Sequence, residues 1–281
     1  SSVSNTYFWV GRDYVGRFFP GYISNLRVSN SVRYSSAFTP SLTPLTNDAN
    51  TVLLTCQANR FIDASSNAYA LTVNGTPQYV AKAGDQELCK TNYAVIHRCD
   101  VKAPVAVFEH STPAAMNGPA KRKDNFHPDT AVTPNCSASL ADYAIVGKTH
   151  DRGHMAPAGN NTQNDAIMSE SFNLSNMVPQ VANNNRGIWK QLETFERQWA
   201  MAPGTDFYII SGGIYDQGHP VTGNGLGIPT RLYKIIIEKN SKKVQAYLMP
   251  NAPLPVQDLP KYQTTMTAVE QATGMRFGLG Q

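Results

Sequence analysis

The sequence has few charged side chains and no long apolar run. Charged residues make up 16% of its 281 residues, against about a quarter in an average globular domain. No apolar stretch approaches the roughly 18 residues of a membrane span. The first residues are neither basic nor apolar, so we expect a signal peptide to be absent or to have been removed before residue 1. Low charge and abundant Asn, Ser, Thr, Gly and Pro favour an extracellular or virion-associated protein without a membrane span.

The apolar content that is present suffices for a folded core. Hydrophobic residues account for 41% and aromatic residues for 10%, which excludes wholesale disorder, and the length suits two domains. Residues 1–83 hold six basic and three acidic side chains, so they carry +3 of the net charge of +4. If the rest of the chain binds a polyanion, a few placed cations must do so, because its average field is weak.

Four cysteines, Cys56, Cys89, Cys99 and Cys136, allow three full pairings. None forms a CxxC motif, which argues against structural zinc. Three of them lie between residues 89 and 136, so that region contains either one disulfide or none, and we expect Cys56 to be a buried free thiol.

The first eighty residues contain short β-branched and aromatic segments between turn residues, as in a β-sandwich. We expect strands over 6–10, 21–28, 51–56 and 68–73. The stretches GYISNLRVSNSVRYSSAFTPSLTPL and TVLLTCQANRFIDASSNAYALTVNGTP resemble the C-terminal part of the laminin-G or concanavalin-like jelly rolls of phage tail and adhesion proteins. Residues 1–79 would then be a partial all-β segment whose sheet edges need another domain, a second copy in a homo-oligomer or a partner chain. A structural collar is favoured over a segment that binds a surface or a carbohydrate.

Residues 80–87 are small and polar and are predicted to form a linker to a second domain over 88–281. A helix is predicted over 262–275, with Gly274 as its stop. In this domain we expect strands over 93–97, 105–109, 207–211, 231–237 and 244–248.

The densest polar cluster is the segment Asp151-Arg152-Gly153-His154. An imidazole can act as a base near neutral pH, a guanidinium can bind phosphate through two hydrogen bonds, and glycine allows close approach of the backbone. A strand is predicted over 174–180 and a helix over 187–200, whose buried stripe is Ile188, Leu192, Phe195 and Trp199. Beside this stripe, over about 120° of the helical wheel, lie Asn185, Glu193 and Arg197.

The segments DRGH, SESFNLSNMVPQ and NNNRGIWKQLE, in this order, resemble the DNA/RNA non-specific endonucleases with a ββα-metal site, of the Serratia nuclease and endonuclease G type. KRKDNF at 121–126 resembles the arginine-bearing segment before the family's central motif, and PNAPL and AVEQATGMRF resemble its C-terminal part. The resemblance covers about residues 88–281. It implies an α+β fold in which a ββα-metal nuclease domain has a central antiparallel sheet.

The resemblance also implies roles for single residues. His154 would be the general base, and Asn185 the one direct protein ligand of Mg²⁺, for which Mn²⁺ could substitute. Glu193 would orient water on the metal. The phosphate would be bound by Arg122 and Arg152 with support from Arg197, and Asn176 would shape the site behind the histidine. Gln180 matches the motif without an assigned role.

These residue types fit the hydrolysis of DNA and RNA. Phosphodiester hydrolysis needs a water, a base and neutralisation of the developing charge, and arginines that bind phosphate carry no sequence information. The resemblance implies products with 5′-phosphate ends. The alternative is a virion or adhesion protein with an inactive nuclease-like domain.

Blander interpretations exist for several of these residues. His150 and His154 would be zinc ligands on a helix, but the HExxH glutamate is missing. Glu193 and Arg197 could form a solvated helix pair, and Arg122 lies in a basic run that would ordinarily be a solvated loop. The four other histidines are expected to be structural or at the surface: His97, His110, His127 and His219.

Overall fold

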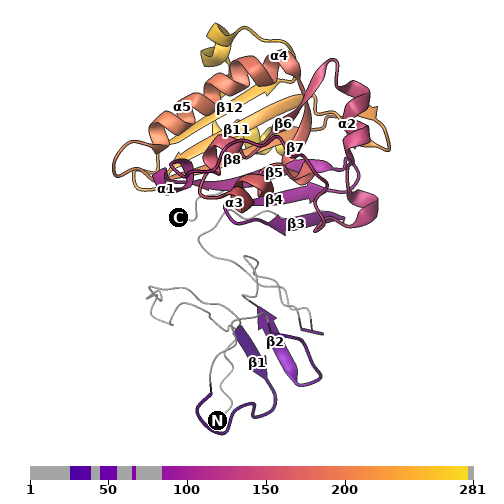
Figure 1. The fold of residues 1–281 in the computed structure, drawn as a ribbon, viewed down its shortest axis with the longest axis vertical. Coiled ribbons are helices and arrows are strands. Elements are labelled where there is room, and N and C mark those ends of the chain that lie inside the picture. Colours follow the sequence, from indigo (N-terminus) through magenta and orange to yellow (C-terminus); the bar gives the residue numbers. More distant parts are fainter. Residues whose placement is uncertain (1–25, 39–44, 56–64, 68–83, 278–281) are drawn as a thin grey trace. The chain divides into compact units, whose positions relative to one another are not determined.

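The computed structural model describes residues 26–38, 45–55, 65–67 and 84–277. The chain divides into two compact units, residues 1–76 and 77–281 (Figure 1). In the first unit, β1 (Leu26–Ser29) and β2 (Thr51–Thr55) form an antiparallel pair, in agreement with two of the expected strands. The strands expected over 6–10 and 68–73, and Cys56, lie outside the described residues. The jelly-roll resemblance and the boundary at residue 79 remain predictions.

The second unit contains most of the described helices and strands. Its strands are β3 (Asp85–Cys89), β4 (Tyr93–Arg98), β5 (Ala103–Ser111), β6 (His150–His154), β7 (Met177–Val181), β8 (Phe207–Ile214), β9 (Val221–Thr222), β10 (Leu226–Gly227), β11 (Arg231–Glu238), β12 (Val244–Pro250) and β13 (Gln263–Thr264). Its helices are α1 (Pro113–Met116), α2 (Leu140–Val146), α3 (Asp165–Glu170), α4 (Ala182–Asn184), η4 (Asn185–Trp189), α5 (Lys190–Ala200) and α6 (Met266–Thr273), with shorter or 3₁₀ segments η1 (Pro134–Cys136), η2 (Ala158–Asn160), η3 (Leu174–Asn176) and η5 (Val256–Tyr262).

A central antiparallel sheet organises this unit and confirms the predicted α+β fold. Its seven described strands follow the order β13-β12-β11-β8-β5-β4-β3, and helix α5 runs across one of its faces (Figure 1). Strand β11 is buried on both faces: Leu232 and Ile236 pack with the buried residues of α5, and Tyr233 and Ile235 pack with Val269 of α6. Residues 232–237 are all buried, as is typical of a strand covered on both faces. The five strands expected for this sheet all form. The strand predicted over 174–180 begins only at Met177, because residues 174–176 form the 3₁₀ segment η3.

The linker predicted over 80–87 is wrong for residues 85–87, which belong to β3 and pair with β4. Leu88 is 3% exposed, and burial of this side chain draws the polar residues before it into the edge of the sheet. The C-terminal prediction holds in part: α6 begins later than residue 262 but ends at Gly274, whose φ of 70° suits glycine. No helix of the described part is long and apolar enough to cross a membrane.

One disulfide forms in the cysteine-rich region, between Cys99 and Cys136, and Cys89 is a half-buried free thiol. The bridge joins the β4–β5 turn to η1 and so closes the loop that contains Arg122. The nearby His97 is 1% exposed and its Nε2 contacts the Cys136 carbonyl at 2.9 Å, which makes this histidine structural, as expected.

Candidate active site

A two-stranded ribbon followed by a helix carries most of the predicted site residues. Strands β6 and β7 pair antiparallel, with His154 opposite Met177. A Cβ atom at Gly153 would lie 2.1 Å from Oε1 and 2.6 Å from Cβ of the buried Gln180, so this position requires glycine. Gln180 therefore has a packing role, and its Nε2 donates to Oδ1 of Asn184 at 2.9 Å.

Beside this ribbon lies a cavity of about 690 Å³. Six of the seven predicted site residues line it: Arg122, Arg152, His154, Asn185, Glu193 and Arg197. The sequence did not single out three further cations of its lining, Lys121, Arg186 and Lys190. Six basic side chains thus surround one carboxylate, that of Glu193. The near-neutral charge of residues 84–281 conceals this local concentration of positive charge.

The helix enters the cavity through an irregular turn. Helix α4, the π-helical η4 and helix α5 follow each other without a break. In an ideal helix, Asn185 and Glu193 would point about 80° apart around the helix axis. A π turn holds one more residue than an α turn, so it reduces this angle. Both residues line the same cavity. The expected stripe remains on the inner side, where Ile188 and Leu192 are fully buried.

His154, at the end of β6, is 8% exposed and packs against two aromatic rings. Its ring centroid lies 5.0 Å from that of Phe172 and 5.6 Å from that of Phe126. Burial, together with the positive charges of Arg122 and Arg152, lowers the pKa of His154 to about 3. The imidazole is neutral at neutral pH, and its buried Nε2 has no hydrogen-bond partner among the described residues. A neutral imidazole with a free ring nitrogen has the state that a general base requires.

The guanidinium groups of Arg122 and Arg152 lie over the same two rings. Cζ of Arg152 is 4.0 Å from the centroid of Phe126, and Cζ of Arg122 is 5.1 Å from that of Phe172. Nε of Arg122 also donates to Asp124 at 2.7 Å. The basic run around Arg122 thus borders the cavity, and both arginines remain exposed enough to bind phosphate.

Asn176 lies outside the cavity lining and is fully buried. Its Oδ1 accepts a hydrogen bond from the backbone N–H of Ala156, and its Nδ2 donates to the carbonyls of Ala156 and Ser171, each at 2.9 Å. Since Ala156 follows His154 by two residues, Asn176 fixes the chain that leaves the histidine.

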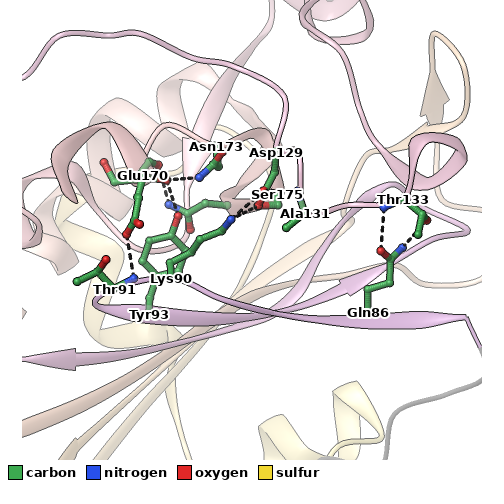
Figure 2. A network of polar contacts seen from close by, with 12 residues as sticks. Gln86, Lys90, Thr91, Tyr93, Asp129, Ala131, Thr133, Glu170, Asn173 and Ser175 are labelled. Atoms are coloured by element: carbon green, nitrogen blue, oxygen red, sulfur yellow. Dashed lines mark hydrogen bonds and ion pairs between the residues drawn. The ribbon is translucent and has the colours of Figure 1, made fainter. Parts of the chain in front are cut away.

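A second polar network holds the residue before Asn176 (Figure 2). The buried carboxylate of Asp129 accepts hydrogen bonds from Ser175 Oγ at 2.5 Å and from Lys90 Nζ at 2.7 Å. Nearby, the hydroxyl of Tyr93 donates to the carbonyl of Glu170 at 2.5 Å. These bonds tie η3 and the end of α3 to the turn between β3 and β4.

The amide of Asn185 has a fixed orientation that suits a hard cation. Its Nδ2 donates to Oδ2 of Asp151 at 2.9 Å, and Arg186 holds the same carboxylate with two further hydrogen bonds. Oδ1 is therefore the amide atom left for a ligand. Mg²⁺ accepts oxygen ligands and retains several waters. No three His, Cys, Asp or Glu side chains of the described residues gather as a metal site. Asn185 and Glu193 are the two predicted metal-site residues that line the cavity.

Burial raises the pKa of Glu193 to about 7, although the positive charge of Lys234 acts in the opposite direction. The neighbouring carboxylate of Glu196 adds to the rise. A divalent cation in the cavity would favour the ionised form of Glu193, because an opposite charge stabilises a carboxylate.

Arg197 does not form an ion pair with Glu193, so the interpretation of these two residues as a solvated helix pair is excluded. Its Nη1 donates to Oδ1 of Asn160 at 3.5 Å. Nδ2 of Asn160 in turn donates to the buried Glu109 and Glu196 at 3.2 and 3.3 Å. Arg197 is thus connected to a buried polar network beneath the cavity.

His150 and His154 lie on strand β6. The helical spacing on which a pair of zinc ligands depends is therefore absent. The buried Asn184 donates from Nδ2 to the carbonyls of Pro250 and Ala252. Asp151, Phe126 and Phe172 stand in the segments that carry the resemblance but had no assigned role. Nothing in the sequence singled out Asn160, because its partners Glu109 and Glu196 are distant in the chain.

The C-terminal part of the chain matches a known protein family. Residues 72–281 match the family model described as DNA/RNA non-specific endonuclease. The mitochondrial nuclease EXOG of Homo sapiens is 32% identical over 213 residues, which are 69% of this chain and 57% of that protein. Mitochondrial endonuclease G of Bos taurus is 27% identical over 223 residues, 72% of this chain and 74% of that protein.

A chain in the crystal structure of the EndoG/EndoGI complex has a TM-score of 0.64 and 30% identity, and the match covers 70% of this chain and 86% of that chain. The chain spans 57% to 62% of the length of the EXOG relatives from human and Danio rerio. The names of EXOG and endonuclease G place both in mitochondria. The expectation of an extracellular or virion-associated protein, which rested on composition, is therefore wrong.

Proposed function

Because the chain belongs to the DNA/RNA non-specific endonuclease family, we propose that it is a metal-dependent nuclease that hydrolyses phosphodiester bonds of both DNA and RNA. The observation that carries this proposal is the neutral, buried imidazole of His154 in a cavity with six basic side chains. Its arginines suit phosphate contacts, so little sequence preference follows. We propose Mg²⁺ as the ion, with Mn²⁺ as a substitute.

His154 accepts a proton from the attacking water while the water oxygen bonds to phosphorus. The bond between phosphorus and O3′ breaks, so the phosphate remains on the 5′ end and O3′ leaves as a hydroxyl after protonation by solvent. Arg122 and Arg152 neutralise the charge on the phosphate, and Asn176 holds the chain behind His154.

Oδ1 of Asn185 would hold the ion, Glu193 would orient water in the cavity, and Arg197 would support the phosphate contacts. When bound, Mg²⁺ supplies positive charge that stabilises the leaving oxygen.

We propose that the domain over 88–281 carries this activity. The β-rich segment over 1–79 would be separate from it, as a collar that pairs with a second copy or a partner chain.

The test measures cleavage of plasmid DNA and of an unstructured RNA by the full chain across a Mg²⁺ titration, with EDTA as the blank. Asn185→Ala should need more Mg²⁺ and recover part of its activity when the ion is raised. Asn183→Ala is the matched control, because the exposed Asn183 lies in the same asparagine run outside the cavity lining. Absence of Mg²⁺-dependent cleavage by the parent would refute the proposed nuclease activity. An unchanged Mg²⁺ requirement of Asn185→Ala would refute the role of Asn185 as a metal ligand.

A further inference from the structure

Two phenylalanines without an assigned role lie between the catalytic histidine and the two phosphate-binding arginines. Phe126 follows the basic run 121–123, and Phe172 follows helix α3. Their rings meet edge to face, with centroids 4.9 Å apart and an interplanar angle of 85°. Phe172 is fully buried, whereas Phe126 is half-buried.

Backbone hydrogen bonds fix the two segments against each other. The N–H of His127 donates to the carbonyl of Phe172 at 3.2 Å, and the N–H of Leu174 donates to the carbonyl of His127 at 2.9 Å. His127 and Asn173 thereby form a parallel bridge. The rings adjoin this bridge, so their positions are set by the fold before any substrate binds.

Each ring contacts one of the two arginines. The distances from Cζ to the ring centroid, 4.0 Å for Arg152 over Phe126 and 5.1 Å for Arg122 over Phe172, lie within the range of about 6 Å for cation–π attraction. Arg152 forms no ion pair with any described residue, so Phe126 is the group that restrains its guanidinium. Arg122 has Asp124 as an additional partner.

The same two rings also pack against the imidazole of His154. The aromatic pair therefore contacts the base and both cations, and it shields part of the imidazole from water. We propose that Phe126 and Phe172 are positioning residues that hold Arg152 and Arg122 where they bind the scissile phosphate beside His154. This inference rests on the proposed nuclease function.

The test uses Phe126, because a half-buried ring can be replaced with less risk to folding than the fully buried Phe172. Phe126→Leu removes the aromatic face and keeps apolar bulk, whereas Phe126→Tyr keeps the ring. The matched control is Phe108→Leu, the same change at a half-buried phenylalanine of β5 that packs near Phe277 and lies outside the cavity lining. All variants are made in the full chain, and their melting temperatures are compared.

Steady-state cleavage of a fluorophore-labelled DNA duplex is measured with Mg²⁺, and binding of the same duplex by fluorescence anisotropy with EDTA. Phe126→Leu should raise KM and the duplex Kd by about three- to tenfold, which is the size of one cation–π contact. Phe126→Tyr and Phe108→Leu should stay within about twofold of the parent. A purely structural loss would instead lower kcat through a smaller active fraction and leave KM unchanged.

The outcomes separate this inference from the function on which it rests. If the parent cleaves with Mg²⁺ and Phe126→Leu keeps the parental KM and Kd, the positioning role is refuted and the nuclease stands. If the parent does not cleave, the proposed function fails. Should Phe126→Leu not fold, Phe126→Met takes its place with the same expected rise in KM, and a parental KM in that variant refutes the role equally.

Discussion

The ion pair between Lys234 and Glu196 is fully buried, and its removal should strongly destabilise the unit over residues 77–281. Nζ of Lys234 lies 2.8 Å from Oε2 of Glu196, both side chains are 0% exposed, and Nζ also lies 4.9 Å from the ring of Trp189. Glu109 and Glu193 bring two further carboxyl groups to the same region, and burial, with the charge of Glu196, raises the pKa of Glu109 to about 8. Lys234 therefore provides the ammonium charge at the centre of this cluster.

Lys234→Met keeps the length of the side chain and removes its charge. Breaking a buried ion pair from one side typically costs about 3–5 kcal/mol, because the remaining ion stays buried without compensation. The double variant Lys234→Met/Glu196→Met should recover much of this loss, since it removes both charges. The free energy of unfolding is measured in urea through the fluorescence of Trp189 and Trp199, which lie in the helix over the network.

Lys261→Met is the matched control. Lys261 pairs with Asp258 at the same distance of 2.8 Å, but its side chain is 71% exposed, and an exposed pair contributes little. If Lys234→Met lost no more stability than Lys261→Met, or if the double variant were less stable than Lys234→Met, the account of the buried network would be refuted.

Three further predictions concern the site and its supports. Because the pKa of His154 is lowered to about 3, its imidazole should stay neutral in an NMR titration of the free protein from pH 8 to 5; a midpoint near 6.5 would contradict its burial. Protonation should then oppose folding as the pH falls below 6.5, since the unfolded chain takes up the proton first. The Cys99–Cys136 disulfide has a sequence separation of 37 residues. The double variant Cys99→Ala/Cys136→Ala should therefore lose about 4 kcal/mol of stability in the chain-entropy estimate. Urea unfolding curves that overlay those of the parent would show that the bridge does not stabilise the fold. Asn176→Ala leaves the N–H and the carbonyl of Ala156 without their side-chain partner. This variant should lose about 1–3 kcal/mol of stability and cleave DNA more slowly. A variant with the stability and cleavage rate of the parent would refute the supporting role of Asn176.

Local pattern predicted five of the seven described strands of the central sheet and the buried stripe of η4 and α5, because both follow from the spacing of apolar residues along one segment. The resemblance to the nuclease family, and not the apolar pattern, implied which side chains would meet, and six of these seven line one cavity. The π turn at Asn185–Trp189 escaped prediction, since one extra residue in a turn hardly alters the apolar pattern.

The buried network and the aromatic pair could not be predicted for a different reason. Glu109, Asn160, Glu196 and Lys234 come from four segments, and their polar character alone suggested exposure. Only the sheet order, which places β5, β8 and β11 side by side under α5 (Figure 1), brings them together. The edge strand β3 was likewise missed because its pairing with β4 is not visible in its polar residues.

We propose His154 as the general base of a Mg²⁺-dependent nuclease. Its most direct test is the single-turnover rate of plasmid cleavage at saturating Mg²⁺ for the parent, His154→Ala and His150→Ala, the last being the matched change on the same strand. We expect His154→Ala to lose about 10²- to 10⁴-fold in rate and His150→Ala to keep a near-parental rate. Equal rates for the parent and a folded His154→Ala would contradict this proposal.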